Sequence, residues 1–218
     1  MLVKKFIAFG AAASDQKPLN VLLERKGAMA KIKLGFALTG SFCTFSEVIP
    51  VVQELVALEY DVLPIMSEFA YTTDTRFGKA SEFAQQLELI TGNKLVHSIV
   101  EAEPIGPKKI MDALIIAPCT GNTLAKISTG VNDTCITMAS KSVLRNQKPL
   151  LIAVSTNDAL ANSAKNIGVL LNAKNVYFIP MKQDDPQSKP RSIVADFRMI
   201  PQAVKKALKN EQIQPIYL

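Results

Sequence analysis

The stretch ALIIAPCTGNTLAKI, residues 113–127, determines the fold class that we expect for this chain. Its first five residues are apolar without alternation, which is typical of a strand that helices cover on both faces. Pro118 ends the predicted strand, and a predicted helix over 122–129 ends at Gly130. A buried strand that leads through a polar loop into a helix is the repeating unit of an α/β protein.

The same alternation of strand and helix continues on both sides of this stretch. Short apolar runs predict strands at 32–38, 60–66, 96–100, 113–117, 150–154 and 176–179. Amphipathic runs predict helices at 47–58, 79–90, 122–129, 133–146, 155–171 and 193–208, with loops at 67–78 and 180–192. Right-handed crossovers between such strands produce a doubly wound, mainly parallel sheet in a three-layer αβα sandwich of the Rossmann-like type.

The composition of the 218 residues excludes several classes of protein. An apolar fraction of 48% is too high for a disordered chain, and no apolar run approaches the ~20 residues of a membrane-spanning helix. Three cysteines without a CxxC pair and a single histidine argue against a disulfide framework and against a metal centre. The sparse cysteines favour a reducing, cytoplasmic compartment, and we expect Cys43 and Cys119 to be small buried residues rather than nucleophiles.

The net charge of +6 does not indicate a nucleic-acid-binding surface. Residues 1–28 hold five basic and two acidic groups, so the remainder carries 20 basic and 17 acidic groups. Those 20 groups are scattered, and the sequence has no basic stripe with interleaved aromatic residues. We therefore expect neither nucleic acid nor a membrane as a partner.

Residues 1–28 differ in character from the rest of the chain. Two lysines, Lys4 and Lys5, precede about eight apolar residues, which resembles a short signal peptide. A second methionine, Met29, stands shortly before the first predicted strand. Export is the alternative; we predict that 1–28 form an N-terminal extension, flexible or not native to the protein, and that 29–218 form the folded domain.

Two loops at the carboxyl ends of predicted strands carry neutral polar groups. In the loop 39–45, Gly40 lets a ligand approach the backbone and hydroxyls precede a helix, which suits a phosphate; a simple Ser/Thr helix cap is the alternative. Neither G-x-G-x-x-G nor the lysine of an NTPase phosphate loop is present. In the second loop, Thr120, Asn122 and Thr123 suit a flavin phosphate, a flavin ring edge or a substrate carboxylate.

These loops resemble those of a known family. TGS at 39–41, a strand that ends in Ser67, and APxTxNTLAKIxxGxxD at 117–133 resemble the flavoprotein family of FMN-dependent cysteine decarboxylases and flavin prenyltransferases. The resemblance covers residues 31–180 and implies a flavoprotein fold with FMN as the cofactor. The cofactor-binding residues that it implies are Thr39, Gly40, Ser41, Ser67, Thr120, Gly121, Asn122 and Thr123.

The chain departs from that family at positions that matter for catalysis. The decarboxylases place a histidine shortly after the second strand, where this chain reads YTT at 71–73. Of the decarboxylase motif that follows the strand ending at Val154, only Asn157 is retained. The prenyltransferases carry an arginine near the position of Met138, which weakens that activity as well. His97 is expected to be packed or solvated rather than a base, so no catalytic residue is assigned.

Within the family, the chain has a closer resemblance to one oxidoreductase component, which covers nearly all of 29–218. The supporting stretches are TTDTRFG at 72–78, AEPIGPK at 102–108, STNDAL at 155–160 and QDxPxxKP at 183–190. Such a component oxidises a cyclic dihydro- or hydroxytetrahydro-dicarboxylate to pyridine-2,6-dicarboxylate together with an NAD(P)-binding partner. The resemblance implies a hetero-oligomer that is inactive without its partner, and homo-oligomerisation as well. Another flavin-dependent enzyme of this fold and a non-catalytic scaffold are the alternatives.

A dianionic substrate favours a guanidinium, which can fork onto a carboxylate. Arg76 is the only arginine in the strand-end loops, so we hypothesise that it binds a substrate carboxylate with help from Asn122 and Asn157. Alternatively, Arg76 pairs with Asp74 or Glu82 on a solvated face. Secondary candidates for anion or interface contacts are Lys108, Lys109, Lys189 and Arg191.

Overall fold

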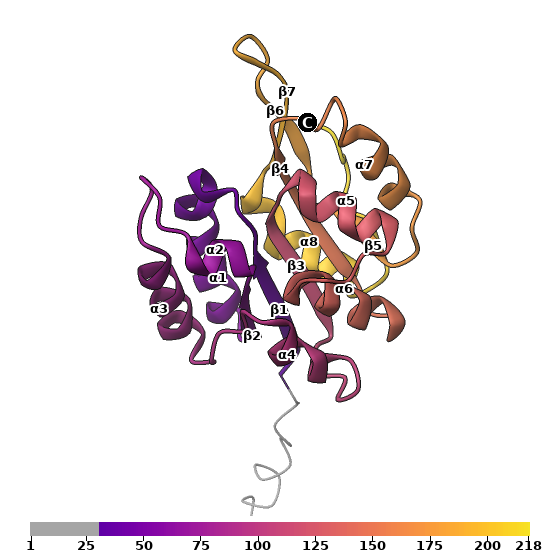
Figure 1. The fold of residues 1–218 in the computed structure, drawn as a ribbon. Helices are drawn as coiled ribbons and strands as arrows, with labels where there is room; N and C mark the ends of the chain where they lie inside the picture. Colours follow the sequence, from indigo (N-terminus) through magenta and orange to yellow (C-terminus); the bar gives the residue numbers. More distant parts are fainter. Residues whose placement is uncertain (1–30) are drawn as a thin grey trace, which may run out of the picture. The chain divides into compact units, whose positions relative to one another are not determined.

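The computed structural model describes residues 31–218, and the predicted extension 1–28 lies outside the described residues. Seven strands form one sheet, with helices on both of its faces (Figure 1). The strands are β1 Lys33–Leu38, β2 Asp61–Met66, β3 Ala113–Cys119, β4 Leu150–Thr156, β5 Val176–Phe178, β6 Met181–Asp185 and β7 Lys189–Ala195. The helices are α1 Phe45–Ala57, α2 Glu68–Thr72, α3 Ala80–Thr91, α4 Ile99–Ala102, α5 Gly121–Thr129, α6 Cys135–Arg145, α7 Ala164–Leu171 and α8 Ile200–Ala207.

Five parallel strands form the centre of the sheet in the order β2-β1-β3-β4-β5. The chain winds in one direction from β1 to β2 and in the other from β3 to β5, so the order reverses between β1 and β3. In doubly wound sheets, ligands bind beyond the carboxyl ends of the strands at this reversal. The predicted α/β fold is thus confirmed, and its switch point tells us where to look for the site.

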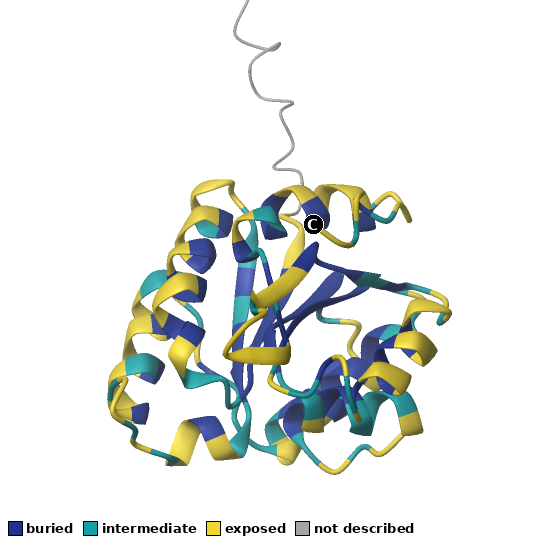
Figure 2. Cartoon of the chain, turned by 90° about the horizontal axis from the view of Figure 1, so that it is seen from above, coloured by how far each residue is buried: buried dark blue, intermediate teal, exposed yellow. Residues whose placement is uncertain are grey.

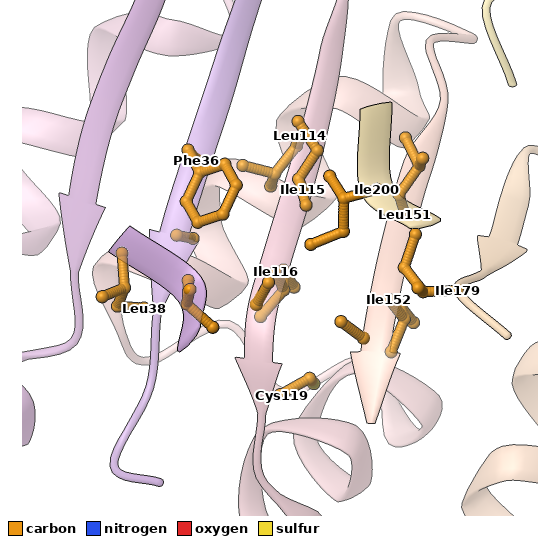
Figure 3. Close-up of a cluster of buried hydrophobic side chains, with 14 of the residues drawn as sticks. Phe36, Leu38, Leu114, Ile115, Ile116, Cys119, Leu151, Ile152, Ile179 and Ile200 are labelled. Carbon is orange, nitrogen blue, oxygen red and sulfur yellow. The ribbon is translucent and has the colours of Figure 1, made fainter. Parts of the chain in front are cut away.

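Two layers of helices bury the central strands. Helices α1, α3 and α8 pack together in one layer, and α4, α5, α6 and α7 pack together in the other. Figure 2 shows the helices with their exposed sides outward and the buried strands between them. Phe36, Leu114 and Ile116 have no exposed surface (Figure 3), and burying each such side chain contributes about 1.5–3 kcal/mol to stability. No helix within 31–218 combines the length and apolar character needed to cross a bilayer.

The predicted strand 96–100 is not a strand. Val96 makes one isolated bridge to Ile65, and helix α4 begins three residues later. Ser98 and Glu101 form a capping box, in which each side chain accepts a hydrogen bond from the other's backbone N–H. The cap favours a helical turn over continued strand pairing, so it overrides the β-branched character of this run.

The predicted loop 67–78 contains the short helix α2. Ser67 caps this helix, because its side chain accepts a hydrogen bond from the backbone N–H of Ala70 at 3.2 Å. The rest of the segment includes a tight turn in which Thr75 and Gly78 pair. The polar residues after β2 are therefore ordered into a cap, and Ser67 stays at the end of the strand.

The predicted loop 180–192 is a β-hairpin, and the predicted helix 193–208 begins only at Ile200. Strand β7 pairs with β6 and, through Ser155 and Thr156, with the end of β4. Both pairings are antiparallel, so the hairpin adds a mixed edge to the parallel sheet.

The prolines that predicted a loop are compatible with this hairpin. Pro180 precedes β6, Pro186 lies in the turn, and Pro190 lies where the pairing with β6 is irregular. Proline lacks a backbone N–H, so it is tolerated at strand starts and bulges but not in a regular ladder. The hairpin extends beyond the other strands (Figure 1), and most of 182–191 is exposed.

Two predicted boundaries move near the switch point. Strand β3 continues through Pro118 to Cys119, with irregular pairing to β4 around the proline. The predicted helix 155–171 begins only at Ala164, because 157–163 form turns. Both changes lengthen the segments that lie at the carboxyl edge of the sheet.

Candidate functional site

One threonine holds the ends of β1 and β3 together at the switch point. The Thr39 hydroxyl donates to the carbonyl oxygen of Pro118 at 2.7 Å and accepts from the backbone N–H of Thr120 at 3.0 Å. Thr39 is buried, so water does not compete for these bonds. Gly40 and Thr120 both line two neighbouring hollows.

The first hollow, which we call the α5 hollow, has a volume of about 420 Å³. Its lining comes from the loops after β1, β2 and β3 and from the starts of α2, α5 and α6. The lining residues are Thr39, Gly40, Ser67, Glu68, Phe69, Thr120, Asn122, Thr123, Lys126, Thr134 and Ile136. Six of the eight predicted cofactor-binding residues are therefore brought together, all except Ser41 and Gly121.

The amino terminus of α5 is open, whereas that of α6 is capped by side chains. No group in the described part of the chain accepts a hydrogen bond from the backbone N–H of Gly121, Asn122 or Thr123. At α6, the first N–H donates to the Glu68 carboxylate at 3.0 Å, and the Thr134 hydroxyl accepts from the third. Unpaired N–H groups and the helix dipole together bind phosphate or carboxylate. An anion in this hollow therefore fits at α5.

Neutral hydroxyls and one glycine shape the α5 hollow. The hydroxyl oxygens of Thr120 and Thr123 are 3.3 Å apart. A Cβ atom at Gly40 would lie 3.0 Å from the ring of Phe69, which is tighter than ordinary contact. Glycine at this position keeps the backbone accessible between the ring and the α5 terminus.

One ion pair lies at the border of the α5 hollow. The Lys126 ammonium donates to both carboxylate oxygens of Asp133, at 2.8 and 2.9 Å. This hydrogen bonding is the main reason why the pKa of Asp133 lies below its ordinary value. Lys126 is thus a cation beside the hollow, and the Asp133 carboxylate already neutralises its charge.

The second hollow, which we call the hairpin hollow, has a volume of about 550 Å³. It is lined by the loops after β1 and β4, by the start of α1 and by the β6–β7 hairpin. The lining residues are Gly40, Ser41, Phe42, Cys43, Thr44, Glu47, Phe77, Thr120, Ser155, Thr156, Asn157, Asp184, Lys189, Ser192, Ile193 and Val194. Because Gly40 and Thr120 line both hollows, the two are direct neighbours.

Ser41 lies in the hairpin hollow, apart from the other predicted cofactor-binding residues. The loop after β1 continues into a 3-10 turn, in which the Thr44 hydroxyl and N–H both donate to the Ser41 carbonyl oxygen. The Ser41 hydroxyl lies 2.8 Å from the Ser155 hydroxyl at the end of β4. The structure therefore does not place Ser41 in one cradle with Ser67 and Thr123.

Gly121 packs against the Asp158 carboxylate and its two hydroxyl partners, and it lines neither hollow. The Asp158 carboxylate accepts hydrogen bonds from the hydroxyls of Thr156 at 2.7 Å and Ser163 at 2.9 Å. A Cβ atom at Gly121 would lie 2.7 Å from the Ser163 oxygen and 2.9 Å from the Asp158 carboxylate. Glycine therefore lets the start of α5 pack on the loop after β4, and Gly121 offers only its backbone N–H to a ligand.

Arg76 also lines neither hollow. It lies in an exposed turn, with its guanidinium carbon 4.9 Å from the centre of the Phe77 ring. Within 31–218, it forms no ion pair with Asp74 or Glu82, the alternative partners. Phe77 lines the hairpin hollow, so Arg76 is next to its rim rather than inside it.

The two asparagines that were expected to assist Arg76 lie in different hollows. Asn122 lines the α5 hollow, and Asn157 lines the hairpin hollow. The three predicted substrate-binding residues are therefore separated. Their loops follow three different strands, and the direction of each side chain depends on packing that the sequence does not reveal.

His97 lines neither hollow. Its ring stacks on Tyr71 with the ring centres 3.9 Å apart. Its Nε2 atom lies 3.9 Å from the Glu101 carboxylate. The pKa of Glu101 is lowered, chiefly because the carboxylate accepts a hydrogen bond from the His97 backbone N–H. This environment agrees with a packed, partly solvated histidine and offers no base to either hollow.

The three cysteines occupy different environments. Cys119 and Cys135 are buried, and burial raises the pKa of both thiols. Cys43 is exposed and lines the hairpin hollow, so the prediction that it is buried is wrong. The 3-10 turn after β1 carries Cys43, and it leaves this side chain outside the core.

Comparison with known proteins agrees with the geometry of the switch point. The family model described as Flavoprotein matches residues 22–204, which is most of the chain. The chain belongs to the flavoprotein family. Among its relatives, the B subunit of dipicolinate synthase from Bacillus subtilis (strain 168) is 43% identical over 184 residues, which are 84% of this chain and 92% of that protein.

Solved structures of flavoproteins show the same fold. The crystal structure of the dipicolinate synthase B subunit from Bacillus halodurans C has a TM-score of 0.79 and 43% identity, covering 86% of this chain and 96% of that chain. The FMN-dependent cysteine decarboxylase SpaF has a TM-score of 0.60 and 22% identity, covering 83% and 97%. The predicted family and the Rossmann-like fold are confirmed.

The α5 hollow of this flavoprotein fits a flavin mononucleotide. The open α5 terminus supplies three unpaired N–H donors for a phosphate. The Ser67 hydroxyl accepts one hydrogen bond from its own helix, so its hydrogen remains free to donate. Asn122 and Thr123 add neutral donors beside the same terminus. The residues present therefore suit the cofactor that membership of the family supports.

Several lining residues of this flavoprotein are not among the predicted site residues. They are Phe42, Cys43, Thr44, Glu47, Glu68, Phe69, Phe77, Lys126, Thr134, Ile136, Ser155, Thr156, Asp184, Ser192, Ile193 and Val194. The β-branched pair Ile193 and Val194 is a sequence signal for the hairpin, but the prolines before it predict a loop. The capping role of Glu68 has no sequence signal, because Glu68 and the start of α6 meet only in the fold.

Proposed function

We propose that this flavoprotein is the B subunit of a dipicolinate synthase, which acts with an A subunit. The 43% identity to the Bacillus subtilis relative over most of both chains carries the proposal. The substrate is a cyclic dihydro- or hydroxytetrahydro-dicarboxylate. The hydroxytetrahydro form first loses water, and the dihydro form then loses two hydrogens to become pyridine-2,6-dicarboxylate.

The α5 hollow is the proposed FMN site. The phosphate of FMN would contact the open amino terminus of α5, with Ser67 and Thr123 as hydroxyl donors. Bound there, a flavin would supply two-electron oxidation. Gly40 and Thr120 line both hollows, so they would lie between this cofactor and a ligand in the hairpin hollow.

The hairpin hollow is the proposed place for the cyclic dicarboxylate. It adjoins the α5 hollow, and it offers the hydroxyls of Ser41 and Ser155 and the amide of Asn157. Uncharged donors of this kind bind carboxylates without requiring a buried cation. Arg76 stands next to the rim and is a secondary contact in this proposal.

The partner subunit is the proposed holder of the nicotinamide cofactor, NAD(P). The sequence of this chain lacks the dinucleotide fingerprint G-x-G-x-x-G. We therefore expect the chain to form a hetero-oligomer with an A subunit, to self-associate and to be inactive alone. We place the assembly in the cytoplasm, on the basis of its sparse cysteines.

Titration with FMN tests the cofactor site. We expect saturable quenching of flavin fluorescence by the purified full chain. Thr123→Val keeps the shape of the side chain and removes its hydroxyl, so FMN affinity should fall about tenfold. Thr129→Val is the matched control, because Thr129 lies at the other end of α5 and donates only to its own helix. Equal effects of the two substitutions, or no binding by the wild type, would contradict the cofactor site.

Reconstitution with the A subunit tests the enzyme class. We expect dicarboxylate oxidation, followed as formation of pyridine-2,6-dicarboxylate, only when both subunits are present. Full activity of the two subunits after all FMN has been removed would favour a scaffold without a working flavin. A cysteine decarboxylase is the weaker alternative, because 71–73 lack the family's histidine.

A further inference from the structure

A second lysine–aspartate ion pair spans the β6–β7 hairpin at the hairpin hollow. The Lys189 ammonium lies 2.6 Å from an Asp184 carboxylate oxygen, and the two side chains are 54% and 37% exposed. Lys189 is the only basic side chain among the residues that line this hollow. The attraction of the hollow for an anion therefore depends on what this one ammonium contacts.

A pair of hydroxyls lies in the same hollow. Ser41 Oγ and Ser155 Oγ are 2.8 Å apart, and Ser155 is buried. Cys43 Sγ lies 3.9 Å from Ser41 Oγ. The pKa of Lys189 is raised chiefly by its hydrogen bond to Asp184, and the nearby Cys43 adds to this rise. The ammonium and the hydroxyl pair thus border a common space.

We infer that Lys189 binds one carboxylate of the cyclic dicarboxylate by releasing Asp184, while Ser41 and Ser155 bind the other carboxylate. This inference rests on the proposed function, since it takes the dicarboxylate as the ligand of the hairpin hollow. It makes Asp184 an internal competitor for the substrate. The hairpin then carries both the cation that recognises the substrate and the anion that masks this cation.

The exchange requires little free energy. Exposed ion pairs are weak, because water screens both charges and ordering two long side chains costs entropy. A ligand carboxylate replaces one carboxylate contact of Lys189 by an equivalent one, and its second carboxylate accepts the hydroxyl hydrogen that the bond between Ser41 and Ser155 leaves free. Glu47, the other carboxylate of the lining, has the Arg198 guanidinium nearby, so its charge is partly offset.

Isothermal titration with pyridine-2,6-dicarboxylate tests the inference on the full chain, in buffer free of divalent cations. Lys189→Gln should weaken binding about fivefold, because it removes the only cation of the lining. Asp184→Asn should instead strengthen binding about threefold, because it frees Lys189. Lys189→Arg keeps the charge and should restore most of the affinity. Opposite signs for two neighbouring substitutions are hard to produce by loss of folding.

Matched controls change the same charges outside the hollow. Lys182→Gln removes a cation of the same hairpin, and Glu211→Gln removes a carboxylate that pairs with Lys206; neither residue lines the hollow. We expect each control to change the affinity less than twofold. Salt should weaken binding by the wild type more steeply than binding by Lys189→Gln, because only the wild type keeps the ammonium contact.

Ser41→Ala tests the second carboxylate contact. It should reduce the preference for pyridine-2,6-dicarboxylate over pyridine-2-carboxylate, which has one carboxylate only. If Asp184→Asn fails to strengthen binding, or if the controls match the test variants, the inference is wrong and the proposed function stands. If the wild type binds neither ligand while the two subunits together oxidise the substrate, this site is also wrong, but the enzyme class holds.

Discussion

The two hollows each carry a lysine–aspartate pair, and the two pairs differ in how they are held. Lys126 donates to both oxygens of Asp133, and both residues lie on the fixed framework of α5 and the turn before α6. Lys189 contacts one oxygen of Asp184 across an exposed hairpin. The Lys126 side chain is 25% exposed and the Lys189 side chain 54%.

This difference separates a structural role from a recognition role. The α5 hollow is built from strand ends and helix starts, so its donors are backbone groups and short hydroxyls in set positions. The hairpin hollow takes much of its lining from a projecting β-ribbon, so its charges can exchange partners. This difference agrees with our proposal that the α5 hollow holds the cofactor and the hairpin hollow the substrate.

Gly121→Ala should have the largest effect, because it damages the framework that both hollows share. The added methyl would lie within 3 Å of the Ser163 and Asp158 oxygens, which hydrogen bonds hold in place. Overpacking of this kind costs about 1–3 kcal/mol, so Tm should fall by about 5 °C. FMN affinity should fall too, since the α5 terminus must shift.

The control for this prediction is another glycine-to-alanine change. Gly168 in α7 has open space around its Cβ position, so Gly168→Ala should leave Tm unchanged or raise it slightly. Differential scanning fluorimetry measures both variants. Equal Tm values for Gly121→Ala and the wild type would show that the start of α5 is not tightly packed. The contrast between a rigid α5 hollow and a flexible hairpin would then be wrong.

Asp133→Asn should have a smaller effect, and the size of this effect depends on pH. The pKa of Asp133 is lowered in the folded chain, mainly by the Lys126 hydrogen bond, so its charge stabilises the fold above the ordinary value of 3.8. This contribution disappears as pH falls through the lowered pKa. The variant should therefore be less stable than the wild type at pH 7, with the difference shrinking below pH 3.8.

Chemical unfolding at pH 7, 5 and 3.5 would measure this difference. FMN affinity of Asp133→Asn should stay within twofold of the wild type, since we assign Lys126 to the framework. A clear gain in FMN affinity would show that Lys126 can release Asp133 and bind the ligand, as we infer for Lys189 and Asp184. The contrast between the two ion pairs would then be wrong.

Arg76→Ala should have the smallest effect, because Arg76 lines neither hollow. The hypothesis from the sequence is that the KM of the Arg76→Ala enzyme for the dicarboxylate rises at least tenfold. The geometry instead predicts a rise of less than twofold in the reconstituted enzyme. A tenfold rise would mean that the rim of the hairpin hollow closes on the substrate through this arginine.

The sequence was a good guide to the parallel core and a poor guide to the hairpin. Uninterrupted apolar runs such as 113–117 are typical of buried strands between helices, so the fold class followed. Prolines at 180–192 obscured β6 and β7, because their tolerance at strand starts and bulges depends on the partner strand. The α5 hollow was largely predictable because it lies at the ends of the parallel strands. The direction of the Ser41 side chain was not, because it depends on a 3-10 turn that only the fold reveals.

The bonds that Thr39 makes to the ends of two strands have a consequence for how this family diversifies. They anchor the wall between the hollows to the centre of the sheet, independently of the hairpin. If the two hollows have the roles that we propose, sequence changes in the hairpin alter which substrate is accepted without weakening FMN binding. On that proposal, a new substrate class requires changes in the hairpin alone, while the cofactor site stays as it is.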